Sequence, residues 1–113
     1  MGNLILNRNQ LSEMKELLAD NFPMLLEIFM RDSKTQLQEI CEWDNPAQNS
    51  SAMMAAHTLK SSAANLGLDQ LAAQCDLIEA ACKKEVSENI AALISDLSQI
   101  YNQSIAELNE AIE

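Results

Sequence analysis

The sequence contains few of the residues that interrupt helices or favour sheets. Its 113 residues include only two glycines, two prolines and two phenylalanines, with one tryptophan and one tyrosine. Alanine, leucine, methionine, glutamate and glutamine are abundant instead, and these residues favour helix. A chain of this length buries roughly two-thirds of its unfolded surface and needs no disulfide to fold. We therefore expect one all-α domain over residues 1–113.

Positive charge is also scarce. Seven basic residues stand against seventeen acidic ones, which gives a net charge of −10 at pH 7. Nucleic acid and anionic membrane surfaces would repel such a chain, so neither is expected as a partner. The sequence has no apolar run long enough to cross a bilayer and no signal-peptide pattern. A cytoplasmic location is the expectation.

Metal ligands are few as well. The chain has one histidine, three cysteines and no C-x-x-C spacing, so we expect no metal site and no bound cofactor. Cys75 and Cys82 would lie about two turns apart on one helix face, which is too far for a disulfide. Reduced core thiols are therefore expected for Cys41, Cys75 and Cys82. Redox sensing by the last two is the alternative, although buried thiols are usually inert.

Five segments carry apolar residues at helical intervals, and no segment alternates at period two. Pro23 fits the first turn of the second segment, Asn45 and Pro46 fit the start of the third, and Gly67 can end it in a left-handed conformation. Long amphipathic helices joined by short loops are most simply an antiparallel, up-and-down four-helix bundle. The expected bundle helices are 22–43, 46–66, 69–84 and 88–112, and a short extra helix at 9–19 would act as a lid or docking helix.

The third segment has a buried face and an exposed face. Apolar residues recur along it at intervals of four, three, four and three, and this stripe must point into the bundle. At about 100° per residue, His57 lies roughly 140° from the centre of the stripe and therefore faces outward. The stripe consists of Ala52, Ala56, Leu59, Ala63 and Leu66.

The neighbours of His57 on its own helix suit a phosphate group. Ser61 and Ala64 are small and leave room for another protein to close over the ring, with Met53 beside them. Lys60 lies one turn away, where its ammonium can reach an oxygen attached to the ring. A solvated surface histidine without special function is the ordinary alternative.

Acidic residues are absent from the segment around this histidine. No Asp or Glu occurs between residues 45 and 68, so we expect a patch free of negative charge that would not repel a phosphoryl group. The chain has no glycine-rich phosphate loop and no evident cluster of acids for Mg²⁺. Another protein must therefore supply the groups that catalyse phosphoryl transfer.

The thirteen residues that begin at Ala56, A-H-T-L-K-S-S-A-A-N-L-G-L, resemble the signature of histidine-containing phosphotransfer (HPt) domains of bacterial two-component phosphorelays. The pattern L-x-x-x-C-x-x-I-E, from Leu71 to Glu79, resembles the family too. The family usually has glycine directly after the lysine, where this chain has Ser61. That serine would narrow access to the histidine or donate a hydrogen bond to the phosphate. The resemblance covers residues 22–81 and implies a stand-alone, monomeric member of the family.

Carried over by position, the resemblance makes His57 the phospho-acceptor through Nε2 of its neutral ring. It makes Lys60 the residue that balances the phosphate charge, and Gly67 the turn that ends the helix. The donor would be a phospho-aspartate on the receiver domain of a hybrid sensor histidine kinase, and the acceptor an aspartate on the receiver domain of a response regulator. Mg²⁺ would belong to these receivers. Arg31 and Lys34 are candidate partner contacts, with ordinary solvated charge as the alternative.

Two other functions compete with this interpretation. A helical adaptor that is never phosphorylated could bind a receiver or kinase and block it, and only His57 and Lys60 argue against it from the sequence. An enzyme acting alone is disfavoured, because a single histidine without a paired carboxylate or a cleft-forming loop provides no acid–base pair.

Overall fold

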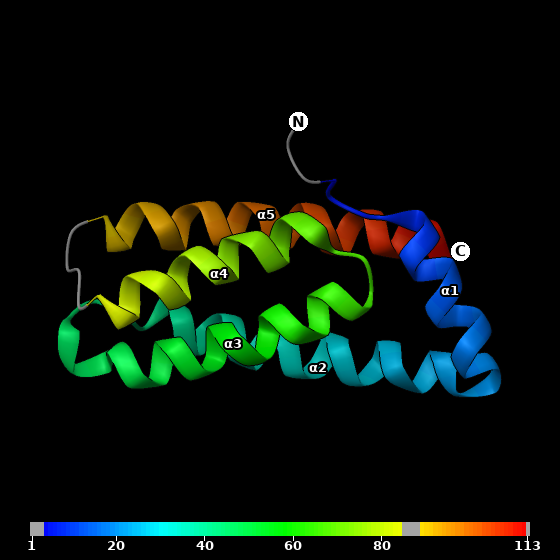
Figure 1. The fold of residues 1–113 in the computed structure, drawn as a ribbon, viewed down its shortest axis with the longest axis horizontal. Coiled ribbons are helices and arrows are strands. Elements are labelled where there is room, and N and C mark those ends of the chain that lie inside the picture. The colour runs from blue at the N-terminus through cyan, green and yellow to red at the C-terminus, as the bar shows by residue number, and fades with distance from the viewer. Residues whose placement is uncertain (1–3, 85–88, 113) are drawn as a thin grey trace.

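The computed structural model describes residues 4–84 and 89–112, and these form helices without a strand. In the described part of the chain four long helices lie side by side, and a short N-terminal helix crosses one end of them (Figure 1). In the bundle, α3 contacts α2 and α4, and α5 contacts α4 and α2. The predicted all-α bundle with a short extra helix is thereby confirmed. The helices are α1 (Arg8–Leu18), α2 (Phe22–Cys41), α3 (Asn49–Asn65), α4 (Asp69–Lys83) and α5 (Ile90–Ile112), with short 3-10 helices η1 (Ala19–Asn21) and η2 (Pro46–Gln48).

The core lies where the apolar stripes of the helices meet. All five residues of the predicted α3 stripe are fully buried. Fully burying one leucine contributes about 1.5–3 kcal/mol, so this stripe fixes the rotation of α3 about its own axis. The same core contains Leu71, Cys75 and Ile78 of α4, Leu97 and Leu108 of α5, and Ile40 of α2, all of them buried.

The connection between α2 and α3 differs from the prediction. Pro46 opens the 3-10 helix η2, the side chain of Asn45 accepts a hydrogen bond from the Ala47 amide at 2.9 Å, and α3 begins only at Asn49. A tight 3-10 turn is a common entry to a helix. The indole of Trp43 is buried beyond the end of α2 and donates a 2.7 Å hydrogen bond to Asn49 Oδ1, which fixes the first residue of α3.

The turn between α3 and α4 requires Gly67. Its φ is +83°, and the Leu68 amide donates a 2.8 Å hydrogen bond to the Ala63 carbonyl, which closes the end of α3. The Gly67 carbonyl accepts a 2.6 Å bond from the Asn7 amide, and a Cβ at Gly67 would lie 2.5 Å from the Asn7 oxygen. The N-terminal segment is thus docked on this turn, and the side chain of Gln10 adds a 3.0 Å bond to the Asn65 carbonyl.

The three cysteines do not share one environment. Cys75 and Cys82 are buried as expected, whereas the expectation that Cys41 is a core thiol is wrong, since Cys41 is exposed at the last turn of α2. Burial raises the pKa of the Cys75 thiol to about 12. The predicted start of the last helix, residue 88, lies outside the described residues. Within the part of the chain that the structure describes, no helix combines the length and apolar character that crossing a membrane requires.

Candidate functional site

His57 lies on the exposed face of α3, between the buried stripe residues Ala56 and Leu59 in sequence. Its side chain is 63% exposed, so the outward orientation predicted from helical register is what the structure has. Ser61 and Ala64 are exposed beside it, and Met53 is half-buried. The Ser61 hydroxyl donates a 3.3 Å hydrogen bond to the His57 carbonyl within the helix. The hydroxyl therefore packs along α3 and leaves the imidazole open to solvent.

A carboxylate from the neighbouring helix holds the imidazole. Glu79 of α4 places Oε2 3.1 Å from His57 Nδ1, and the Glu79 side chain is only 9% exposed. A carboxylate accepts hydrogen bonds, so this contact favours the tautomer with its proton on Nδ1. The lone pair of the neutral ring is then on Nε2. Glu79 belongs to the stretch that resembles the family, but the sequence alone assigned it no role.

Lys60 is joined to the same carboxylate. Its Nζ lies 2.8 Å from Glu79 Oε1 and 3.2 Å from Asp76 Oδ1, while Lys83 Nζ lies 3.7 Å from Glu79 Oε2. Hydrogen bonding to Glu79 and then to Asp76 raises the pKa of the Lys60 ammonium. Hydrogen bonding from Lys60 lowers the pKa of the Glu79 carboxyl against the opposing effect of desolvation, with His57 adding to the lowering. Both groups are therefore charged at neutral pH.

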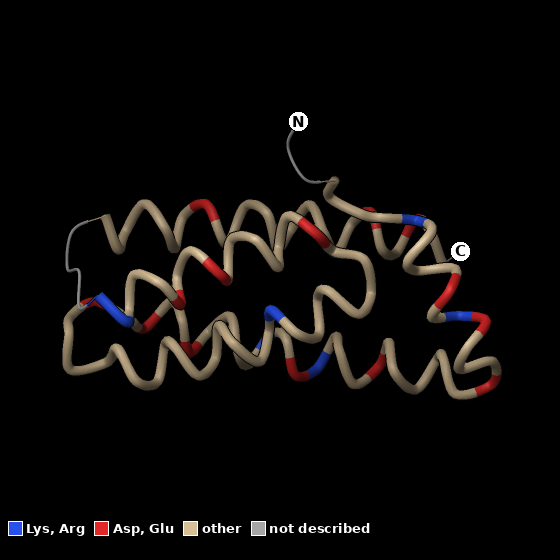
Figure 2. The backbone as a smooth tube through the Cα atoms, in the orientation of Figure 1, with Lys and Arg blue, Asp and Glu red and all other residues tan. Residues whose placement is uncertain are grey.

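The prediction of a patch free of negative charge is wrong in three dimensions. The α3 helix itself carries no acid (Figure 2), but α4 brings Glu79 against the imidazole and Asp76 against Lys60. Helical register describes only neighbours on the same helix, whereas α3 and α4 pack antiparallel along their length and bring residues of α4 beside His57 (Figure 1). The ammonium groups of Lys60 and Lys83 offset the two carboxylates, so the cluster beside His57 is close to neutral.

The other predicted residues lie outside this cluster. Gly67 lies ten positions after His57, in the turn that ends α3, where it acts through its backbone. Arg31 and Lys34 are exposed on α2, and Arg31 Nε lies 3.0 Å from Asp32 Oδ1. The side chains that contact the His57 imidazole and the Lys60 ammonium come from α4, so a role for Arg31 and Lys34 in binding a partner stays a prediction. Among the described residues, no three His, Cys, Asp or Glu side chains are arranged to hold a metal ion.

Comparisons with known proteins identify the family of this chain and some of its relatives. The Hpt domain family matches residues 24–112. The phosphorelay protein LuxU of Vibrio vulnificus (strain YJ016) is 30% identical over 100 residues, which cover 84% of this chain and 87% of that protein. LuxU of Vibrio harveyi is 31% identical over 84 residues, 74% of each chain.

A solved structure shares the fold. The crystal structure of histidine-containing phosphotransfer protein B (HptB) from Pseudomonas aeruginosa PAO1 superposes with a TM-score of 0.86 and covers 97% of this chain and 96% of that one. At 22% identity this likeness speaks for the fold alone. The family match, by contrast, spans α2 to α5 and includes the helix that carries the exposed histidine. The chain therefore belongs to the Hpt domain family.

Proposed function

We propose that this protein is a phosphorelay intermediate in which Nε2 of His57 accepts a phosphoryl group from a phospho-aspartate of one receiver domain and passes it to an aspartate of another. The observation that carries the proposal is an imidazole that is open to solvent while a buried carboxylate holds its other nitrogen. A free surface histidine would have no such partner. The family relationship and the LuxU relatives support the same role.

In the accepting step, the Nε2 lone pair attacks phosphorus in line with its bond to the donor aspartate. That bond breaks, its electron pair stays on the aspartate carboxylate, and a phosphorus–nitrogen bond forms. Nδ1 keeps its proton, so the ring becomes positively charged as the bond forms. Glu79 faces this charge at Nδ1, and a hydrogen bond to a charged group contributes about 1.5–3 kcal/mol. Passing the group on reverses these changes, with the electron pair returning to Nε2.

Lys60 is suited to balance the charge of the phosphate. Its ammonium has three N–H donors, and two acceptors hold it in place, at Glu79 and Asp76. The third donor is available to an oxygen of a phosphoryl group on the ring, one helical turn away. Because Lys60 is anchored on Glu79, the same carboxylate orients both the nucleophile and the positive charge that steadies its phosphate.

The catalytic groups for transfer are assigned to the partner. Phosphoryl transfer depends on several convergent donors and usually on Mg²⁺ around the moving group, and we assign these to the receiver domains. On this proposal the chain is a phosphocarrier without an activity of its own. The hybrid-kinase donor, the response-regulator acceptor, the monomeric state and the cytoplasmic location all stay predictions.

The test is transfer from a phosphorylated receiver domain to the purified protein. The wild-type chain is expected to gain a phosphate that is labile in acid and stable in base. His57→Gln is expected to gain none, while its free energy of unfolding changes by less than about 1 kcal/mol because the ring is exposed. Undiminished uptake by this variant would refute the assignment. If the wild-type chain bound the receiver but took up no phosphate, the protein would instead be an adaptor that is never phosphorylated. No feature of the described residues favours that alternative.

A further inference from the structure

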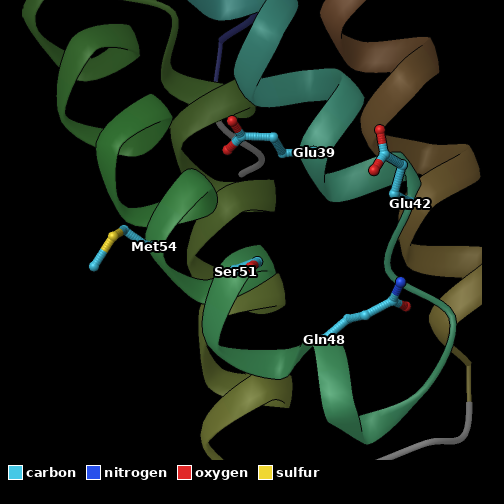
Figure 3. Close-up of a pocket in the computed structure, with 5 residues that line it drawn as sticks. All are labelled: Glu39, Glu42, Gln48, Ser51 and Met54. Atoms are coloured by element: carbon cyan, nitrogen blue, oxygen red, sulfur yellow. The ribbon is translucent and has the colours of Figure 1, made fainter.

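The start of α3 lines a different hollow on each of its two sides. On the side toward α2, Gln48 and Ser51 share a hollow with Glu39 and Glu42, whose carboxylates would repel an anion (Figure 3). On the side toward α4 lies a second hollow of about 290 Å³, which we call the α3–α4 hollow. Its lining consists of Pro46 of η2, of Asn49, Ser50 and Met53 of α3, and of Cys82 and Lys83 of α4.

The described lining of the α3–α4 hollow carries a positive charge and no negative one. Lys83 is the charged residue among the six. Burial, with a contribution from Glu79, raises the pKa of the Cys82 thiol, so this thiol is neutral at pH 7. The positive end of the α3 dipole and the negative end of the α4 dipole lie at the same end of the bundle and offset each other (Figure 1). Lys83 therefore sets the sign of the charge in this hollow.

The ammonium of Lys83 has room for a second partner. Its Nζ lies 3.7 Å from Glu79 Oε2, a separation that suits an ion pair but is too long for a hydrogen bond. Glu79 is contacted more closely by Lys60 Nζ, at 2.8 Å, and by His57 Nδ1, at 3.1 Å. The Lys83 side chain is 65% exposed and is not needed to hold Glu79 in place. Its three N–H donors can therefore turn to a ligand in the hollow.

Asn49 supplies a buried donor that lacks a partner. The residue is only 8% exposed, and its Oδ1 accepts a 2.7 Å hydrogen bond from Trp43 Nε1. An indole N–H can only donate, so this bond fixes the amide and leaves its NH₂ end for the hollow that Asn49 lines. Among the described residues, nothing accepts a hydrogen bond from Asn49 Nδ2. Because a buried donor without an acceptor is costly, a ligand oxygen that reached it from the hollow would be stabilised.

We propose that the α3–α4 hollow binds a phosphate group, either free or as the head of a phosphate monoester. The Asn49 amide and the Ser50 hydroxyl donate to its oxygens, and the Lys83 ammonium pairs with its charge. Pro46 and Met53 offer apolar surface to the organic part of a monoester. The inference does not rest on the proposed function, because within residues 4–84 and 89–112 no hydrogen bond or ion pair joins these three polar side chains to the reactive imidazole.

The first test titrates inorganic phosphate into the full chain at pH 7, while sodium chloride keeps the ionic strength constant. Phosphate in water does not phosphorylate histidine, so binding is measured apart from transfer. ¹H–¹⁵N spectra are expected to show saturable shifts of the Asn49 side-chain amide and of the Ser50 and Lys83 backbone amides, with a dissociation constant in the millimolar range. Shifts that centre on His57 and Lys60, or that never saturate, would overturn the proposal.

Two glutamine variants test the charge. Lys83→Gln is expected to weaken phosphate binding about tenfold or more, because hydrogen bonds between charged groups are the strong ones. Lys84→Gln is the matched control: it removes the same charge from the exposed next residue, which does not line the hollow, and less than about a twofold change is expected. Equal losses in both variants would mean that phosphate responds only to net charge, and the proposal would fail.

Asn49→Asp tests the buried donor. The variant keeps an oxygen that can accept from Trp43 but replaces the NH₂ group with a second oxygen, which repels phosphate. Binding is expected to disappear, while the fluorescence of Trp43, the one tryptophan in the chain, reports that the fold is kept. Binding as tight as in the wild type would refute the role of Asn49. Should this variant unfold, the two lysine variants still decide the proposal.

Phenyl phosphate distinguishes the two sources of the phosphate group. If the hollow takes a monoester, the phenyl ring contacts Pro46 and Met53, and binding is expected to be at least about threefold tighter than that of inorganic phosphate. Met53→Ala should then remove this gain and leave the affinity for inorganic phosphate unchanged. Equal affinities for the two ligands would assign the hollow to free phosphate, and binding of neither would overturn the proposal.

Discussion

Replacing Glu79 with glutamine changes the charge at the centre of the site while keeping the size of the side chain. Glu79 accepts from His57 Nδ1 at 3.1 Å with one oxygen and contacts Lys60 Nζ at 2.8 Å with the other. Glutamine has one acceptor oxygen and one amide donor, so it can satisfy only one of these two groups. If its oxygen faces His57, its amide meets the ammonium of Lys60, donor against donor. The variant therefore weakens the hold on the nucleophile, on the lysine, or on both.

The size of the effect follows from the hydrogen bond that changes. A bond to a charged acceptor contributes about 1.5–3 kcal/mol and a neutral one about 0.5–1.5, so the positively charged ring loses roughly 1–2 kcal/mol of stabilisation as the phosphorus–nitrogen bond forms. That corresponds to a transfer rate lowered about five- to thirtyfold. The free energy of unfolding is expected to fall by only about 1 kcal/mol, because Lys60 keeps its 3.2 Å contact with Asp76.

Two measurements test this reasoning together. Long-range ¹H–¹⁵N spectra of the imidazole report which nitrogen carries the proton: the wild type is expected to have it on Nδ1, and Glu79→Gln to shift toward the Nε2 tautomer. Transfer from a saturating receiver is expected to slow in the variant. Asp76→Asn is the matched control, since Asp76 contacts Lys60 but not His57, and less than about a twofold change is expected. A wild-type tautomer and rate in Glu79→Gln would refute the role given to this carboxylate.

Two further predictions concern stability. Gly67→Ala would put a Cβ 2.5 Å from the Asn7 oxygen at a φ of +83°, so the free energy of unfolding measured in urea should fall by about 2–4 kcal/mol; a loss below 0.5 kcal/mol, roughly, would contradict the turn geometry. Because the folded-state pKa of Glu79 is lowered, its stabilising contribution is present above the ordinary carboxyl value and is lost as pH falls through the folded-state pKa. Between about pH 5 and pH 3, the wild type should therefore lose more stability than Glu79→Gln, and parallel pH profiles would contradict the ion pair.

Much of the fold could be predicted because the spacing of apolar residues along each helix identifies the face that is buried. The α3 stripe is apolar at helical spacing, so both the burial of Leu59 and the exposure of His57 follow from the same angle of about 100° per residue. The start of α3 could not be read in this way. It depends on the 2.7 Å bond between Trp43 and Asn49, and that bond involves a side chain beyond the end of another helix.

The contacts of the site depend on how α3 and α4 pack against each other. The sequence of one helix alone does not reveal that packing. Even so, the sequence held a sign of Glu79. This residue lies four positions after Cys75 and three before Cys82, so it falls on the buried stripe of α4. A carboxylate on such a stripe needs partners to stay charged. In the structure these partners are His57 and Lys60 of α3. Counting acids within residues 45–68 alone misses Glu79, because it lies on the next helix.

Buried and exposed carboxylates affect phosphate transfer in ways that can be measured separately. Glu79 is buried and contacts His57 directly, so it acts at short range, is little screened by salt, and bears on the chemical step. Exposed carboxylates such as Glu39 and Glu42 of α2 act at long range, before a partner makes contact, and salt screens them. A rate constant measured with saturating receiver therefore depends on Glu79, whereas one measured with dilute receiver also depends on the exposed carboxylates and on the net charge of −10. The salt dependence of transfer should accordingly appear only in the second quantity.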